Sequence, residues 1–206
     1  MIVIVDYGLG NLGSIRNMLR KIGYEATVSG EAEDIRSASK LILPGIGAFD
    51  SGMRDLNATG VVDILHEKAL EEKIPVLGIC LGAQLMTKRS DEGKEAGLGW
   101  FEAETRRMTF EGIPGRWPLP NIGWRDVKAQ NGYSLLDESQ GTPRFYFVHS
   151  YYMHAQTPEI VSMTSEYGFE FACGLSRGNL HCAQFHPEKS HVFGKRLLQA
   201  FAELEA

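Results

Sequence analysis

A cysteine set between glycines is the first feature of the sequence that could do chemistry. Gly78-Ile79-Cys80-Leu81-Gly82 ends an apolar run and precedes a helical pattern. A strand that turns sharply into a helix strains the backbone, and small neighbours let the chain and a substrate approach the sulfur. Free N–H groups and the helix dipole there stabilise a thiolate. The pattern is typical of a nucleophile elbow, although Cys80 alone could also be an ordinary buried cysteine.

A histidine and a glutamate near the C-terminus could activate this sulfur. Pro187 biases His186 toward extended backbone, in which residues two apart project to the same side, so Glu188 can reach the imidazole. The carboxylate would fix the tautomer and leave the other ring nitrogen to accept the thiol proton. We therefore predict a catalytic triad of Cys80, His186 and Glu188. The remaining candidate bases lack an acid two positions on: His149, His154, His181 and His191.

Two backbone amides could stabilise an oxyanion beside the cysteine. One is the N–H of Leu81, directly after the nucleophile, and a second could come from the loop Pro44-Gly45-Ile46-Gly47. Gln84 lies one turn along the predicted helix, where its amide could meet the substrate. An ordinary exposed helix position is the alternative for Gln84.

The elements that must position these residues change character along the chain. Short apolar runs that alternate with helical patterns predict a parallel sheet wrapped by helices in the first half. Short strands separated by Gly, Pro and Asn predict antiparallel pairing in the second half. We expect strands at 1–5, 26–28, 40–43, 75–79, 98–108, 145–153, 160–164, 169–176 and 180–185, and helices at 11–22, 64–70, 83–88 and 191–204.

Composition narrows the function classes. The chain has 206 residues, 43% of them hydrophobic and 23% charged, which fits one globular domain over residues 1–206. The net charge of -5 and the scattered basic residues argue against a nucleic-acid or membrane partner. Three cysteines without metal-ligand spacing, and no secretion signal, lead us to expect a cytoplasmic protein with neither metal nor cofactor.

The motifs together carry a resemblance. Gly78 to Gln84, read as G-x-C-x-G-x-Q, with His186-Pro187-Glu188 far downstream, resembles the class I glutamine amidotransferases. More narrowly, the chain is similar over nearly its whole length to the HisH family, the glutaminase subunits of imidazole glycerol phosphate synthase. The segments that carry this likeness are Asp6 to Asn11, Leu43 to Phe49, Gly123-Trp124, Tyr146 to Tyr151 and His186 to Ser190.

The resemblance implies a fold and a reaction. The fold would be the class I glutamine amidotransferase fold, a flavodoxin-like three-layer α/β/α sandwich with a mixed, mainly parallel sheet and added antiparallel strands in the second half. Glutamine would be hydrolysed to glutamate and ammonia through a thioester on Cys80. Ammonia would pass to a cyclase subunit of the HisF type, a heterodimer partner in histidine biosynthesis.

The resemblance also implies roles for further residues. Carried over by position, Gly47 and Leu81 line the oxyanion site. Gln84 holds the glutamine. The remaining positions fall into two groups: His149, Ser150 and Tyr151 along the substrate pocket, and Asn11, Trp124 and Lys189 facing the synthase.

One stretch departs from the family pattern. The chain reads Pro120-Asn121-Ile122-Gly123-Trp124-Arg125 where the family usually shows Pro-His-x-Gly-Trp-Asn, and the preceding Gly115-Arg116-Trp117-Pro118 also differs. Because this stretch would lie toward the partner, an alternative stays open. The chain could be a paralogous glutamine amidotransferase subunit that supplies ammonia to another amination pathway, such as surface-sugar synthesis.

Three other classes compete with a glutaminase. Residues 8–13 spell G-x-G-x-x-G between a strand and a helix, a formal match to the dinucleotide fingerprint, although Asp6 would repel a pyrophosphate there. A stand-alone thiol hydrolase could share the elbow but has no use for Gln84. A catalytically inactive binding subunit would not need the triad residues together.

Overall fold

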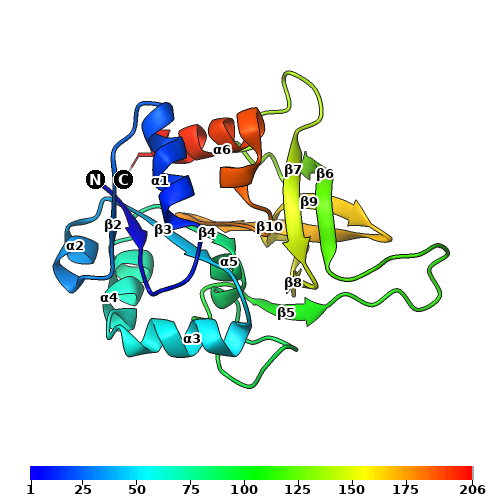
Figure 1. Cartoon of the computed structure of the whole chain (residues 1–206), viewed down its shortest axis with the longest axis horizontal. Helices are drawn as coiled ribbons and strands as arrows, with labels where there is room; N and C mark the ends of the chain where they lie inside the picture. Colours follow the sequence, from blue (N-terminus) through cyan, green and yellow to red (C-terminus); the bar gives the residue numbers. More distant parts are fainter. Residues whose placement is uncertain (206) are drawn as a thin grey trace.

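The computed structural model describes residues 1–205. A nine-stranded sheet runs through the molecule with helices on both of its faces, and a separate two-stranded sheet lies beside it (Figure 1). The strand order of the large sheet is β2-β1-β3-β4-β11-β10-β9-β6-β7.

One half of the large sheet is parallel. Its strands come from the first 80 residues, except for β11, which returns from the C-terminal part of the chain to pair with β4. Their bounds are β1 Ile2–Val5, β2 Ala26–Ser29, β3 Lys40–Gly45, β4 Val76–Cys80 and β11 Leu180–Ala183.

The other half of the sheet is antiparallel, as predicted for the second half of the sequence. Its strands are β6 Asn121–Ala129, β7 Arg144–His149, β9 Val161–Tyr167 and β10 Phe169–Arg177. The separate sheet pairs β5, Ala103–Arg107, with β8, Tyr151–Ala155.

Helices form the outer two layers. One face carries α1 (Leu12–Lys21) and α6 (His191–Glu203), and the opposite face carries the helices that follow β2, β3 and β4 (Figure 1). The latter are α2 Ala32–Ser37, α3 Phe49–Ala58, α4 Val62–His66 with the π-helical turn η1 Glu67–Glu71, and α5 Leu81–Leu85. Short 3₁₀ turns lie at η2 Pro158–Ile160 and η3 Pro187–Lys189.

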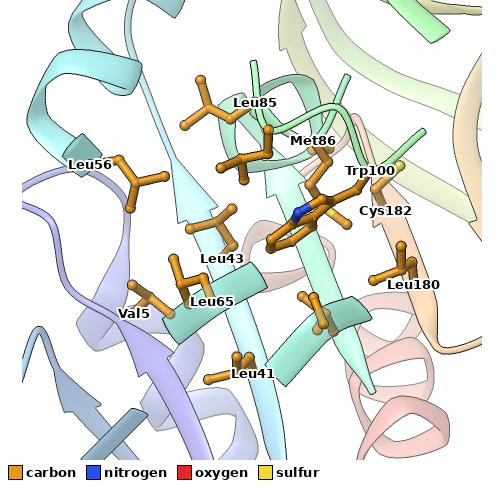
Figure 2. Packing of buried hydrophobic residues seen from close by; sticks show 14 of the residues in the cluster. Val5, Leu41, Leu43, Leu56, Leu65, Leu85, Met86, Trp100, Leu180 and Cys182 are labelled. Atoms are coloured by element: carbon orange, nitrogen blue, oxygen red, sulfur yellow. The ribbon is translucent and has the colours of Figure 1, made fainter. Parts of the chain in front are cut away.

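The alternation of side chains along the parallel strands divides the core in two. Ile2 and Ile4 of β1 pack toward α1 and α6, whereas Val3 and Val5 pack toward the other helices. Burial on both faces explains why these strands are uninterrupted apolar runs. Figure 2 shows the cluster that contains Val5, to which strands, helices and a loop all contribute. Its labelled residues are Val5, Leu41, Leu43, Leu56, Leu65, Leu85, Met86, Trp100, Leu180 and Cys182.

The predicted three-layer α/β/α sandwich with a mixed sheet is confirmed, but some local predictions are wrong. The single strand expected over 145–153 is two strands, β7 and β8, which belong to different sheets and part at Ser150. Of the strand expected over 98–108, only β5 forms. The elements α2, α3 and β6 were missed, because their sequences mix charged residues and glycine with few apolar positions.

Helix α3 shows why an element with weak local preference can still form. Its sequence FDSGMRDLNA has weak helix propensity, yet Phe49, Met53 and Leu56 are buried against the sheet. Gly52 lies close to α5, and a Cβ there would already touch the Leu81 side chain at 3.0 Å. Tertiary packing therefore stabilises a helix that local preference does not favour.

Candidate active site

Cys80 lies at a strained turn between β4 and α5. Its backbone has a φ of 55° and a ψ of -111°, a region that side chains other than glycine rarely occupy. The flanking glycines make the turn possible: a Cβ on Gly78 would lie 2.8 Å from Ala83 Cα, and one on Gly82 would overlap the carbonyl oxygen of Leu43. The sharp strand-to-helix turn that the glycine spacing predicted is therefore present.

The sheet explains how the C-terminal histidine reaches this cysteine. Strand β11 pairs in parallel with β4, and Ala183 stands opposite Ile79, so the residues that follow both strands emerge at the same edge. His186 is 3% exposed, and its amide donates to the Tyr146 carbonyl over 2.9 Å. Its side chain and Cys80 line the same pocket, close enough for the sulfur to influence the pKa of the imidazole.

The acid contacts the histidine, but not through the backbone conformation that we predicted. His186 itself is extended, whereas Pro187 begins the 3₁₀ turn η3 that contains Glu188. The turn brings Glu188 Oε1 to 2.7 Å from His186 Nδ1. Asn11 Nδ2 donates to the same oxygen over 2.7 Å.

Electrostatics within this group favour a charged histidine. Burial alone would lower the pKa of His186, but hydrogen bonds with Cys80 and Glu188 and the charges of both groups raise it to about 9. Burial raises the pKa of Glu188, yet the His186 side chain and the Asn11 amide hold that pKa below its usual value. The imidazole thus retains its proton between a sulfur and a carboxylate at neutral pH.

A pocket of about 290 Å³ opens beside the sulfur. Its wall contains Cys80 and His186, and the residues predicted for the oxyanion site and the substrate pocket: Gly47, Leu81, Gln84, His149, Ser150 and Tyr151. Cavities of about 330 Å³ beside β6 and about 440 Å³ between α1 and α6 are larger, but neither contains the cysteine. The structure therefore brings together residues that are separated by up to 139 positions in the chain, from Gly47 to His186.

Two of the lining residues have defined hydrogen bonds. Gln84 is 6% exposed and is not an ordinary exposed helix residue. Its Nε2 donates to Gln184 Oε1 over 3.0 Å and to the Tyr151 carbonyl over 3.3 Å. His149 is 5% exposed, and burial, only partly offset by a hydrogen bond to Tyr151, lowers its pKa to about 4. The His149 ring is therefore neutral.

The irregular segment between α5 and β5 adds a residue that the sequence did not indicate. Glu92 lines the pocket, and its Oε2 accepts a hydrogen bond from the Phe49 amide over 2.8 Å at the start of α3. No spacing relative to Cys80 marks this carboxylate, because it reaches the pocket from an irregular loop. Gln184 was also missed in this role: it is fully buried, and its Nε2 lies 3.9 Å from Cys80 Sγ.

Of the three residues predicted to face a synthase, Lys189 lines this pocket, whereas Trp124 lines the separate cavity beside β6. Trp124 stacks on His191 with ring centroids 5.5 Å apart, and it meets the edge of Tyr146 at 6.2 Å. Lys189 Nζ lies 6.0 Å from the centre of the Tyr146 ring and lines the pocket. Asn11 instead contacts Glu188 directly.

The described part of the chain lacks a metal-binding group of side chains and a membrane-spanning helix. Residues 1–205 contain no group of three or more His, Cys, Asp or Glu side chains placed to hold a metal ion. No helix in that range is long and apolar enough to cross a membrane.

Comparison with known proteins places the chain in a family. Residues 3–203 match the family model described as glutamine amidotransferase class-I. Proteins named imidazole glycerol phosphate synthase subunit HisH 2, from Methanococcus maripaludis and Pseudomonas aeruginosa, are each 46% identical. They cover 98% and 99% of this chain, and the matches span 98% and 100% of their own lengths.

Solved structures share the fold at lower identity. A crystal structure described as a glutamine amidotransferase has a TM-score of 0.75 and 21% identity, covering 98% of this chain and 97% of that one. The structure of PurLQS from Thermotoga maritima has a TM-score of 0.72 and 18% identity, covering 98% and 96%. Because the family model and the relatives both span nearly its whole length, the chain belongs to the class-I glutamine amidotransferase family.

Proposed function

We propose that this chain is the glutaminase subunit of an imidazole glycerol phosphate synthase. It hydrolyses glutamine to glutamate and ammonia, and it passes the ammonia to a separate cyclase subunit of the HisF type for histidine biosynthesis. The observation that carries this proposal is the contiguous arrangement of a strained Cys80, a buried His186 and a buried Glu188 side chain at one pocket. Curated relatives named HisH, 37 to 46% identical over nearly the full chain, support the pathway.

The proposed chemistry begins with the cysteine and histidine as an ion pair. The thiolate of Cys80 attacks the side-chain carbonyl carbon of glutamine, and the amides of Gly47 and Leu81 stabilise the oxyanion. The His186 imidazolium gives its proton to the departing nitrogen, so that ammonia leaves and a thioester remains. The neutral imidazole then takes a proton from water, which attacks the thioester and releases glutamate. Glu188 orients the ring throughout.

Substrate recognition would use the polar groups of the pocket wall. Both hydrogens of the Gln84 amide nitrogen have acceptors, so Gln84 would accept from glutamine through its Oε1 oxygen. Glu92 supplies a carboxylate at the pocket, which suits the α-ammonium group of an amino acid. Ser150 and Tyr151 would complete the site.

The partner would bind over the opening of this pocket. Lys189 lines the pocket, Asn11 contacts Glu188, and Trp124 stacks on His191. Large apolar side chains are exposed at Ile46, Ile122 and Val192. Residues 1–206 would act as one domain in a heterodimer, without metal or cofactor. All three cysteines are free, which fits a reducing cytoplasm.

One observation favours a second candidate. Both relatives at 46% identity carry the number 2 in their names, whereas six HisH relatives without a number are 37 to 42% identical. The chain also departs from the usual HisH pattern at residues 115–118 and 120–125. A paralogous subunit that supplies ammonia to another amination pathway, such as surface-sugar synthesis, is therefore the alternative.

The test uses the chain purified with a histidine-pathway cyclase subunit. We expect glutamine-dependent formation of imidazole glycerol phosphate, which Cys80→Ser abolishes while synthesis from added ammonium persists. Cys173→Ala serves as the control, because Cys173 is a buried thiol that does not line the pocket. Equal loss of both activities in Cys80→Ser would contradict the division of labour. Glutamate release without transfer to this acceptor would favour the paralogous subunit.

A further inference from the structure

A series of hydrogen bonds leads from Arg125 of β6 to the wall of the pocket. Arg125 Nε donates to Asn121 Oδ1 over 3.1 Å, and Asn121 Nδ2 lies 2.9 Å from His149 Nε2. His149 Nδ1 lies 2.8 Å from the Tyr151 carbonyl oxygen. The pairing of β6 with β7 sets Asn121 directly opposite His149, and Asn121 is completely buried.

Only one arrangement of protons satisfies all three contacts. A carbonyl oxygen can only accept, so His149 Nδ1 must carry the proton that faces Tyr151. In a neutral ring Nε2 is then an acceptor, and the Asn121 amide must present its nitrogen to it. That orientation leaves the amide oxygen for the Arg125 guanidinium, which can only donate. Arg125 therefore fixes the orientation of Asn121, and Asn121 fixes the tautomer of His149.

The Tyr151 carbonyl connects this series of hydrogen bonds to Cys80. Tyr151 O also accepts from Gln84 Nε2, which donates to Gln184 Oε1, and Gln184 Nε2 lies 3.9 Å from Cys80 Sγ. A shift of the His149 ring would move the Tyr151 carbonyl and with it an acceptor of the Gln84 amide. The orientation of Gln84 thus depends on residues that do not line the pocket.

Arg125 is itself held from outside the pocket. Its guanidinium carbon lies 4.8 Å from the centre of the Tyr167 ring, and its Nη1 donates to the Trp124 carbonyl over 3.2 Å. Tyr167 donates to the Pro118 carbonyl over 2.7 Å, and Trp117 packs edge-on against it at 5.2 Å. Residues 115–118 and 120–125, the two stretches that depart from the family pattern, therefore meet at Tyr167 and form one unit.

We propose that Arg125 and Asn121 are positioning residues for the substrate pocket: they hold His149 as the Nδ1–H tautomer and so place the Tyr151 carbonyl and the Gln84 amide against which glutamine binds. This inference rests on the proposed glutaminase function. The charged groups that face His149 are Arg125 and His186, and both disfavour a proton on its ring. Neither Arg125 nor Asn121 lines the pocket.

The tautomer can be tested independently of any activity. In the full chain labelled with ¹⁵N-histidine, two-dimensional NMR distinguishes protonated from bare ring nitrogens, and His149→Gln assigns the signal. We expect the wild-type ring to be protonated at Nδ1 alone. Asn121→Asp replaces the amide donor by a carboxylate, so Nε2 should also gain a proton. A wild-type ring protonated at Nε2, or a pattern unchanged in Asn121→Asp, would overturn the proposal.

Kinetics of the chain with its cyclase subunit test the consequence for the substrate. Arg125→Gln should raise the KM for glutamine about tenfold and lower kcat by less than about threefold, because a charged hydrogen-bond partner of the positioning chain is lost. Lys128→Gln, which removes a positive charge from the exposed face of the same strand, should change neither value. The KM for glutamine of the double variant Asn121→Leu/Arg125→Gln should be no higher than that of Asn121→Leu alone. Both substitutions act through the same series of hydrogen bonds.

The outcomes separate this inference from the proposed function. An unchanged KM in Arg125→Gln, or additive effects in the double variant, would refute the positioning role while the wild-type complex still releases glutamate. Absence of glutamate release by the wild-type complex would instead refute the proposed function, and the NMR result would stand by itself.

Discussion

The substitution Glu188→Gln tests how the acid assists His186. Asn11 donates to Glu188 Oε1, the same oxygen that lies 2.7 Å from His186 Nδ1. A glutamine at this position can keep an oxygen between these two donors, so the tautomer of His186 should survive. What disappears is the negative charge. The variant therefore separates the electrostatic effect of the acid from its orienting effect.

The size of the electrostatic effect follows from the pKa of His186. The rise from the ordinary value of 6.5 to about 9 corresponds to about 3 kcal/mol in favour of imidazolium, shared between Cys80 and Glu188. If the charge of Glu188 supplies about half of this, its loss costs about 1.5 kcal/mol and lowers the pKa of His186 by about one unit. We expect kcat/KM to fall about tenfold, far less than in Cys80→Ser.

The assay is glutamate release by the complex as a function of pH. Because the ion pair requires a protonated imidazole, activity should be lost on the alkaline side as pH passes the pKa of His186. This alkaline limb should move to lower pH by about one unit in Glu188→Gln. Glu166→Gln, which removes an exposed negative charge from β9, is the control and should leave the limb in place. A limb that does not move, despite a lower kcat/KM, would refute the electrostatic reasoning.

Three further predictions follow from the same structure. Gly82→Ala should lower the free energy of unfolding by about 3 kcal/mol or more in urea titrations, because the new methyl group would overlap the Leu43 carbonyl. Burial lowers the pKa values of His149 and His181 to about 4, so the stability that these neutral rings contribute should be lost as pH falls from about 6.5 toward 4, with unfolding midpoints as the measure. Without its partner, the chain should release glutamate only weakly, because Gly47 has a φ of 101° and can turn its amide away from the pocket; full activity of the isolated chain would remove this idea.

Residue order alone predicted the local structure of the candidate site well where the signal is local. The glycines around Cys80 marked a sharp turn, and the turn exists because only hydrogen atoms fit at Gly78 and Gly82. The proximity of His186 and Glu188 in sequence marked their contact, although the turn η3 makes it instead of an extended chain. The apolar runs marked the parallel strands because both of their faces are buried.

Residue order could not show what depends on contacts between distant segments. Glu92 reaches the pocket from an irregular loop, and Asn11 bonds to an acid 177 positions away. Helix α3 and strand β6 have weak local preferences and form because neighbouring elements cover them. No periodicity or fixed spacing in the sequence predicts these contacts between distant segments.

The division has a simple physical reason. Backbone strain and turn geometry are set by residues adjacent in the chain, so the candidate nucleophile, base and acid could be proposed from the sequence. The distance between sulfur and imidazole is set by the pairing of β4 with β11, and the hydrogen bonds from Arg125 to Tyr151 are set by the pairing of β6 with β7. These strand pairings depend on how the whole core packs, so only the tertiary structure shows them.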